Sequence, residues 1–214
     1  SVNTFMGHLA GDATTTGVNN VAVGANSLDA NTTGYSNVAV GQAALTTATT
    51  GYENVAVGKD ALGALTDGFE NTAVGQNAGG GITTGDNNTF LGNAAGQATT
   101  TADGNTAVGN AALASNTTGV SNTAVGKGAA DAATTANHMV AIGFGALKAQ
   151  TTGQYNVGIG AGSAGGALTT GDGHVIIGYQ AGDAMTTNTQ CVAIGMTAGT
   201  AITTGSYHTV VGYN

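Results

Sequence analysis

Proline, tryptophan and arginine are all absent from this chain of 214 residues. Proline fixes the backbone and punctuates loops and linkers. Nothing interrupts the chain in that way, and no linker or domain boundary is visible. We therefore expect a single domain over residues 1–214.

Charged residues are scarce as well, at 7% of the chain. Eleven acids stand against only three basic residues, Lys59, Lys127 and Lys148, and the formal net charge is −8. Proteins that neutralise phosphates need clustered lysine and arginine, so we expect no nucleic-acid partner. An anionic membrane surface is disfavoured for the same reason.

Cys191 is the one cysteine, so a disulfide within the chain is excluded. No apolar run approaches the length of a membrane span, and we expect no direct membrane insertion of this segment. No signal peptide is recognisable. The chain begins and ends inside repeat units, which predicts a fragment of a longer protein whose targeting segments lie elsewhere.

Glycine is abundant, with 38 residues, and it marks a repeat. Units such as Asn54-Val55-Ala56-Val57-Gly58 recur along the chain, and the closing glycine returns every 17 residues. Between Gly160 and Gly178 the spacing is 18, and we place the extra residue around Ala164-Gly165-Gly166. Such a period is typical of a solenoid. The closing glycines are Gly7, Gly24, Gly41, Gly58, Gly75, Gly92, Gly109, Gly126, Gly143, Gly160, Gly178, Gly195 and Gly212.

Each unit predicts one short strand. The residue before the closing glycine is aliphatic, the residue three before it is Val or Thr, and both point to the same side of a strand. The segment that follows, such as Gln42-Ala43-Ala44-Leu45, is too short between glycines to hold a helix. We therefore predict an all-β fold, a parallel β-solenoid of 17-residue coils with a narrow core of small residues.

The complete unit is Gly-x-x-Ala-Leu-x-Ala-x-Thr-Thr-Gly-x-x-Asn-Thr-Ala-Val. It resembles the head repeats of trimeric autotransporter adhesins and the related repeats of phage tail-fibre proteins, over essentially the whole chain. The match lies in the Asn-(Val/Thr)-Ala-(Val/Ile)-Gly strand, the Ala three residues later and the Gly before the next Asn. Autotransporter heads typically use a shorter unit, and the surplus here falls at Thr-Thr, which favours the tail-fibre branch.

This resemblance implies a left-handed β-roll of three chains wound side by side. It also implies display outside a cell or on a virion, and an adhesive function.

Asparagine stands four residues before the closing glycine in nine units. Stacked side-chain amides bond along the axis, so we predict a structural ladder. Met139, His174, Cys191 and His208 replace asparagine in this column. Imidazole and thiolate are zinc ligands, but three ligands in a line do not converge on one ion, and we predict no metal and no cofactor. Beyond Asn3, the predicted ladder comprises Asn20, Asn37, Asn54, Asn71, Asn88, Asn105, Asn122 and Asn156.

Each complete coil also carries a Thr-Thr pair, except that Asp67 replaces the second threonine in one coil. Glycine usually follows, which we attribute to a turn that needs positive φ. Two flat threonine columns would suit an ice-binding face. Since adjacent residues on a strand face opposite sides, the alternative is that one column turns inward and the other caps the turn. The first column, the alternative ice-binding face, is Thr15, Thr32, Thr49, Thr66, Thr83, Thr100, Thr117, Thr134, Thr151, Thr169, Thr186 and Thr203.

Three aromatic residues, Tyr35, Tyr52 and Phe69, occupy equivalent places on successive coils. They predict an exposed strip that either stacks on itself or receives a sugar ring or another fibre face. The acids are spread singly along the chain, and Glu53 and Glu70 near this strip form the nearest approach to a catalytic pair. No long loop encloses them, so we predict no enzyme and no catalytic residues.

The sequence therefore predicts a structural or adhesive fibre segment, the shaft or head of an extracellular or phage tail fibre. We expect a homotrimer at a cell surface or on a virion. Its multivalent surface would bind a cell-surface glycan or receptor. The alternative function is that of an ice-binding solenoid.

Overall fold

The computed structural model describes residues 2–162 and 164–213. The chain divides into two compact units, Ser1–Asn105 and Thr106–Asn214. Every strand has three residues and directly precedes a closing glycine. The first unit contains β1 (Thr4–Met6), β2 (Val21–Val23), β3 (Val38–Val40), β4 (Val55–Val57), β5 (Thr72–Val74) and β6 (Thr89–Leu91). The second contains β7 (Thr106–Val108), β8 (Thr123–Val125), β9 (Val140–Ile142), β10 (Val157–Ile159), β11 (Val175–Ile177), β12 (Val192–Ile194) and β13 (Thr209–Val211).

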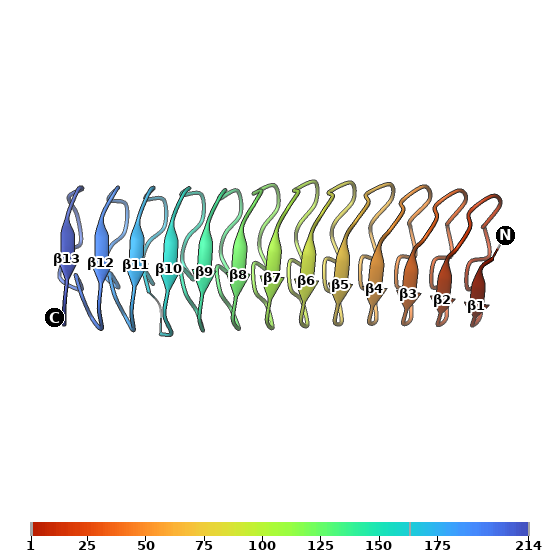
Figure 1. The fold of residues 1–214 in the computed structure, drawn as a ribbon, viewed down its shortest axis with the longest axis horizontal. Coiled ribbons are helices and arrows are strands. Elements are labelled where there is room, and N and C mark those ends of the chain that lie inside the picture. Colours follow the sequence, from red (N-terminus) through yellow and green to blue (C-terminus); the bar gives the residue numbers. More distant parts are fainter. Residues whose placement is uncertain (1, 163, 214) are drawn as a thin grey trace. The chain divides into compact units, whose positions relative to one another are not determined.

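Within each unit, successive strands lie side by side and pair in parallel, so each coil stacks on the one before (Figure 1). The register joins equivalent residues: Val38 pairs with Val55, and Ala39 with Ala56. The prediction of an all-β parallel β-solenoid with 17-residue coils is confirmed. The handedness, the trimer and the single domain over residues 1–214 stay predictions.

The coil between Gly160 and Gly178 contains the extra residue, and hydrogen bonds to the neighbouring coils narrow its position. The Gly162 N–H donates to Phe144 O at 3.1 Å, as Ala43 does to Ala25 O in an ordinary coil. The Leu147 N–H donates to Ala164 O at 3.0 Å, as Leu45 does to Ala61 O. Gly162 and Ala164 therefore hold their usual places. The extra residue lies between these two positions, at the edge of the stretch that the sequence indicated, and residue 163 itself is outside the described residues.

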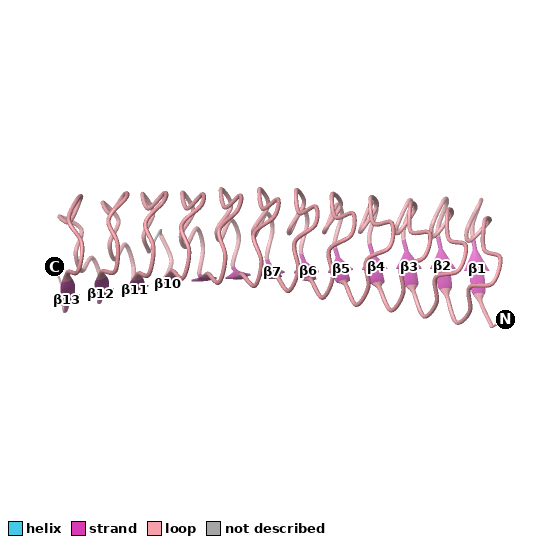
Figure 2. Cartoon of the chain, turned by 90° about the horizontal axis from the view of Figure 1, so that it is seen from above, coloured by secondary structure: helices cyan, strands magenta, loops and turns pink. Residues whose placement is uncertain are grey.

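The rest of each coil is built from turns and bends, which link one strand to the next (Figure 2). Two non-glycine residues in the segment after β3 adopt left-handed backbone, Ala43 with φ 55° and Leu45 with φ 50°. No described residue of that segment is helical, as predicted. The N–H groups of these residues donate to the previous or the next coil, which holds a conformation that is costly for non-glycine residues.

The core is a thin column of small side chains. The middle strand residue points inward and is fully buried, as for Ala56 in β4, while Val55 and Val57 on either side are half-buried on the outer face. Where the middle strand residue is larger than alanine, glycine stands at the position that a core leucine, such as Leu45, occupies in other coils. Phe90 in β6 is fully buried, and its ring lies where side chains at Gly79 and Gly96 would stand.

The closing glycines are required because of close backbone contact. A Cβ at Gly58 would lie 2.6 Å from the carbonyl oxygen of Gly75, and φ at this residue is +134°. The glycine after the Thr-Thr pair has a different cause from the one predicted. Gly51 and its equivalents do not have positive φ, except Gly205 at 92°. Glycine is favoured there because the next coil approaches: a Cβ at Gly51 would lie 2.7 Å from Gly68 O.

Candidate functional site

The asparagine column lies inside the coils and links each coil to its neighbours. Asn54 donates from Nδ2 to Gly68 O at 2.8 Å, and its Oδ1 accepts the Asn71 N–H at 3.0 Å. Asn54 is fully buried, as are Asn37 and Asn71 on either side. Because one amide satisfies a turn carbonyl and the next coil's N–H, this column stabilises the stack and is inaccessible to a ligand.

His174 performs the same task with an imidazole. Its Nδ1 accepts the Cys191 N–H at 3.3 Å, and its Nε2 lies 2.7 Å from Asn188 O. A carbonyl can only accept, so the neutral ring carries its proton on Nε2. Burial lowers the pKa of His174, although both backbone hydrogen bonds and Asp172 oppose that shift. Both ring nitrogens are therefore engaged by the backbone.

The replacements Cys191 and Met139 are also fully buried in the column. Met139 donates its N–H to Asn122 Oδ1 at 3.0 Å. In the described part of the chain, no group of three or more His, Cys, Asp or Glu side chains is placed to hold a metal ion.

The threonine columns both lie toward the surface. Thr32 of the first column is half-buried and Thr33 of the second is exposed, whereas Asn31 before them is buried. The first-column hydroxyls donate to the next coil: Thr32 Oγ1 lies 3.0 Å from Thr49 O. The first column is half-buried, and the residue before the pair occupies the core position.

The predicted aromatic strip forms a continuous stack in the first unit. The ring centroids of Tyr35 and Tyr52 are 4.9 Å apart, as are those of Tyr52 and Phe69, with the rings within 6° of parallel. Since Tyr52 has a ring on each side, its faces are covered and its edge is what remains for a partner.

The acids near this strip are surface groups. Glu53 and Glu70 are exposed, and so is Asp67 on the intervening turn. Asp86, on the next coil after Phe69, accepts the Phe69 N–H at 2.9 Å. Partial burial raises the pKa of Asp86, while that hydrogen bond lowers it and Asp103 raises it further. Asp86 thus has a backbone partner that explains its position.

The outer face of the strands carries, in each unit, a row of aliphatic side chains directly before the closing glycines and beside it a row of Val and Thr. Its side chains are Val, Thr, Ile, Leu or Met, with no charged residue. Val74, Leu91 and Ile142 are 36%, 37% and 38% exposed. Parallel sheets in proteins are normally covered on both faces, so this uncovered one is unusual.

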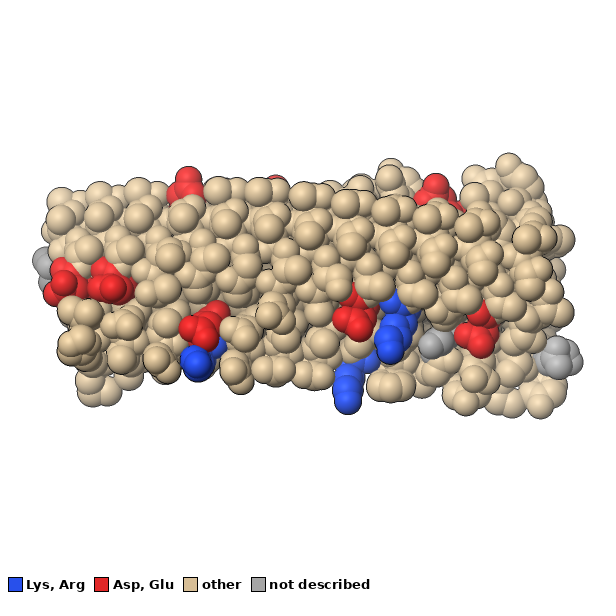
Figure 3. Space-filling model, turned by 180° about the vertical axis from the view of Figure 1, so that it is seen from behind, with Lys and Arg blue, Asp and Glu red and all other residues tan. Residues whose placement is uncertain are grey.

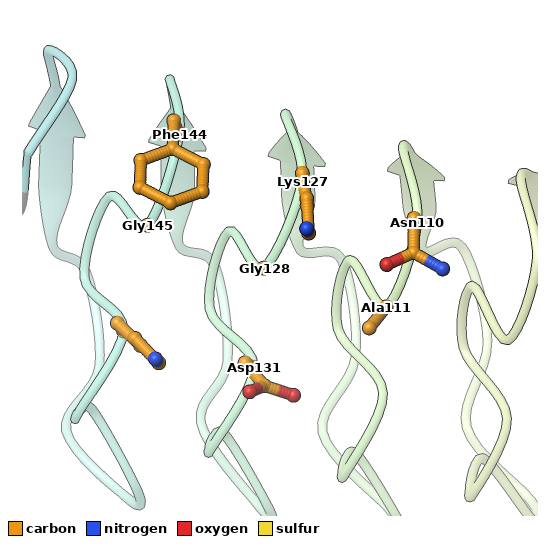
Figure 4. Close-up of a pocket in the computed structure, with 8 residues that line it drawn as sticks. Asn110, Ala111, Lys127, Gly128, Asp131, Phe144 and Gly145 are labelled. Carbon is orange, nitrogen blue, oxygen red and sulfur yellow. The ribbon is translucent and has the colours of Figure 1, made fainter.

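A hollow of about 370 Å³ opens on the second unit between two columns of side chains (Figure 4). Asn110, Lys127 and Phe144, each directly after a closing glycine, line one side on successive coils. Asp131 and Lys148 line the other side. The floor between them is Ala111, Gly128 and Gly145.

We did not predict this hollow from the sequence, although one feature of the repeat marks its position. The second residue after the closing glycine is glycine in three successive coils, at Gly128, Gly145 and Gly162, whereas every other coil carries a side chain there. A Cβ at Gly128 would meet nothing within 4 Å, so the missing side chains leave open space.

Charged side chains are sparse on the face shown in Figure 3, and the basic ones gather at two places. Lys59 Nζ lies 3.8 Å from Asp60 Oδ2. The other two lysines, Lys127 and Lys148, both line the hollow. Among the described residues, neither of them forms an ion pair within 4.0 Å.

Comparison of the chain with protein-family models, curated proteins and solved structures gives no match. Among the described residues, no helix is long and apolar enough to cross a membrane.

Proposed function

We propose that the chain is a segment of a fibre that acts outside a cell or on a virion and presents a multivalent binding surface. In this proposal, three copies of the chain associate through the outer face of their strands. The solenoid repeat provides a stiff support, and weak sites repeated on the associated chains gain affinity because later contacts become intramolecular.

The uncovered apolar face of the strands carries this proposal. In the first unit it includes Val38 and Val40 of β3 and their equivalents, all without charge. Contiguous apolar surface on a soluble protein marks an interaction site, and a parallel sheet favours a cover on its second face. A second and a third copy would provide it. The resemblance to adhesin heads and tail fibres supports the same assembly.

Sedimentation of the whole chain tests association. We expect a trimer for the natural sequence and a monomer for the double variant Val40→Lys/Val57→Lys, because lysines on this face would bury unpaired charge. Thr33→Lys is the matched control, since Thr33 is exposed at the turn. A monomer for the natural sequence at high concentration would remove the trimeric fibre.

An ice-binding function is the second candidate, and the exposure of the threonines favours it. The second column is exposed in every coil, and the first lies half-buried beside it in all interior coils. The second column therefore presents its threonines to water, whereas the first-column hydroxyls beside it donate to the next coil.

Thermal hysteresis separates this candidate from the fibre. An ice-binding surface predicts hysteresis that is lost when Thr118 is replaced by a bulky residue such as tyrosine. Replacing Gln76, which is exposed directly after a closing glycine and lies outside both threonine columns, should leave it unchanged. Absence of hysteresis at high protein concentration would exclude ice binding.

A further inference from the structure

We propose that the hollow bounded by Lys127, Lys148 and Phe144 binds an acidic saccharide, a sugar ring that carries a carboxylate or a sulfate group. This proposal rests on the proposed adhesive function and gives it a ligand class. The site lies within coils of one chain, so it does not depend on the oligomeric state.

The charge distribution selects an anion. The chain carries −8 overall, and two of its three positive side chains line this one hollow. A protein of this net charge repels anions elsewhere on its surface, so an anionic ligand is attracted only where lysines are concentrated. Lys59, the third, lies beside Asp60 and has an acidic neighbour of its own.

The aromatic ring selects a ligand with an apolar face. Phe144 is 61% exposed, and in the described residues it stacks on no other ring. Its column neighbours are Lys127 before it and Ala161 after it. A sugar ring can therefore stack on it, which the covered faces of Tyr52 do not allow. Figure 4 shows Phe144, Lys127 and Asn110 on three successive coils beside the same hollow.

The remaining polar groups suit the hydroxyls of a sugar. Asp131 faces the hollow from the opposite side and accepts hydrogen bonds from hydroxyl groups. Asp131 also repels an anion, which directs the acidic group toward the lysines. The volume of about 370 Å³ falls in the range of small-molecule sites.

The walls are fixed by the backbone. Lys127 O accepts the Gly145 N–H at 3.1 Å, and Asn110 O accepts the Gly128 N–H at 3.0 Å. The backbone of the hollow is thus in place before a ligand arrives, and binding has to order only the side chains that line it.

Calorimetric titration of the whole chain tests the site with three probes: a short oligogalacturonate, a sulfated galactan oligosaccharide and a neutral galactan oligosaccharide. We expect at least one of the two acidic probes to bind. The neutral probe should bind about tenfold more weakly or not at all, because it lacks the charge-assisted hydrogen bonds to the lysines. The acidic probe that binds identifies the acidic group.

Two variants localise the binding. Lys127→Gln/Lys148→Gln should weaken it about tenfold or more, and Gly128→Asn should abolish it by filling the hollow. Asn26 holds the equivalent position with φ 56°, so the backbone accepts this residue. Lys59→Gln is the matched control and should bind as the natural chain does.

Three results would overturn the proposal: neither acidic probe binds, the neutral probe binds equally well, or the double lysine variant binds no more weakly than Lys59→Gln. Sedimentation of the same sample tests separately whether the chain forms a trimer. A trimer that binds no probe contradicts only the saccharide site, and a monomer that binds contradicts only the trimer.

Discussion

Replacing Asn54 by alanine measures what one rung of the asparagine column contributes to stability. Asn54 lies in an interior coil of the first unit and is fully buried. Its side chain donates to Gly68 O at 2.8 Å and accepts the Asn71 N–H at 3.0 Å. Alanine can do neither, and the strand residues Val55 to Val57 are unchanged.

The expected loss of stability follows from the two backbone groups that lose their hydrogen-bond partner. Gly68 O and the Asn71 N–H are left inside the protein without these partners, and an unsatisfied buried polar group costs about 1–3 kcal/mol. We therefore expect Asn54→Ala to lower the free energy of unfolding by about 4 kcal/mol. Domains are stable by only about 5–15 kcal/mol, so this is a large fraction.

Urea denaturation followed by circular dichroism gives this free energy, and amide hydrogen exchange at Asn71 reports the orphaned N–H directly. Gln42→Ala is the matched control, because Gln42 is exposed in the neighbouring coil. We expect it to change stability by less than about 0.5 kcal/mol. If Asn54→Ala costs no more than the control, the column does not hold the coils together and the reasoning fails.

Gly58→Ala should lower the free energy of unfolding by about 3 kcal/mol, because the new Cβ meets Gly75 O at 2.6 Å in a backbone with φ +134°. Gly63→Ala is the control: its nearest contact is at 3.3 Å, and it should be nearly neutral in thermal unfolding. Phe90→Ala should lower the free energy of unfolding by about 3–5 kcal/mol. Adding Gly96→Leu should recover more than half of that loss in urea denaturation, although Gly96→Leu alone destabilises the protein. A double variant no more stable than Phe90→Ala would contradict this exchange of volume. The His174 pKa is lowered in the fold, so the unfolded chain binds more protons and stability falls as pH drops below about 6.5. His174→Asn should remove that part of the pH dependence of the unfolding midpoint, and equal slopes for both proteins would count against it.

The strands and their register follow from the sequence because each coil buries the same positions against the coils beside it. Val55 pairs with Val38 on one side and with Thr72 on the other, since any other register would break the asparagine column. The residue type that recurs at each position of the repeat therefore determines how the coils stack. That the Ala-Leu segments are not helical followed from their length, which is too short between glycines to hold a helix.

The turn geometry did not follow from the sequence. Leu45 and Ala43 adopt left-handed backbone that residue type disfavours, and only hydrogen bonds to neighbouring coils hold it. The glycine after the Thr-Thr pair has its cause in the next coil, at Gly68 O for Gly51, and not in its own φ. Local propensity cannot reveal a constraint that arises from a neighbour 17 residues away.

The hollow was hidden for a related reason, because it results from side chains that are missing. Gly128 and Gly145 have φ of 63° and 62°, close to the 54° that Ala111 adopts in the coil before. Glycine removes the strain of the left-handed conformation there, but it also costs more conformational entropy on folding. These two effects are of similar size, about 1 kcal/mol each, so stability alone gives no strong reason for glycine in successive coils. Gly128→Asn should accordingly change the unfolding free energy by less than about 1 kcal/mol while it closes the hollow. If Gly128→Asn leaves both stability and saccharide binding unchanged, the glycine is required neither for folding nor for the binding site.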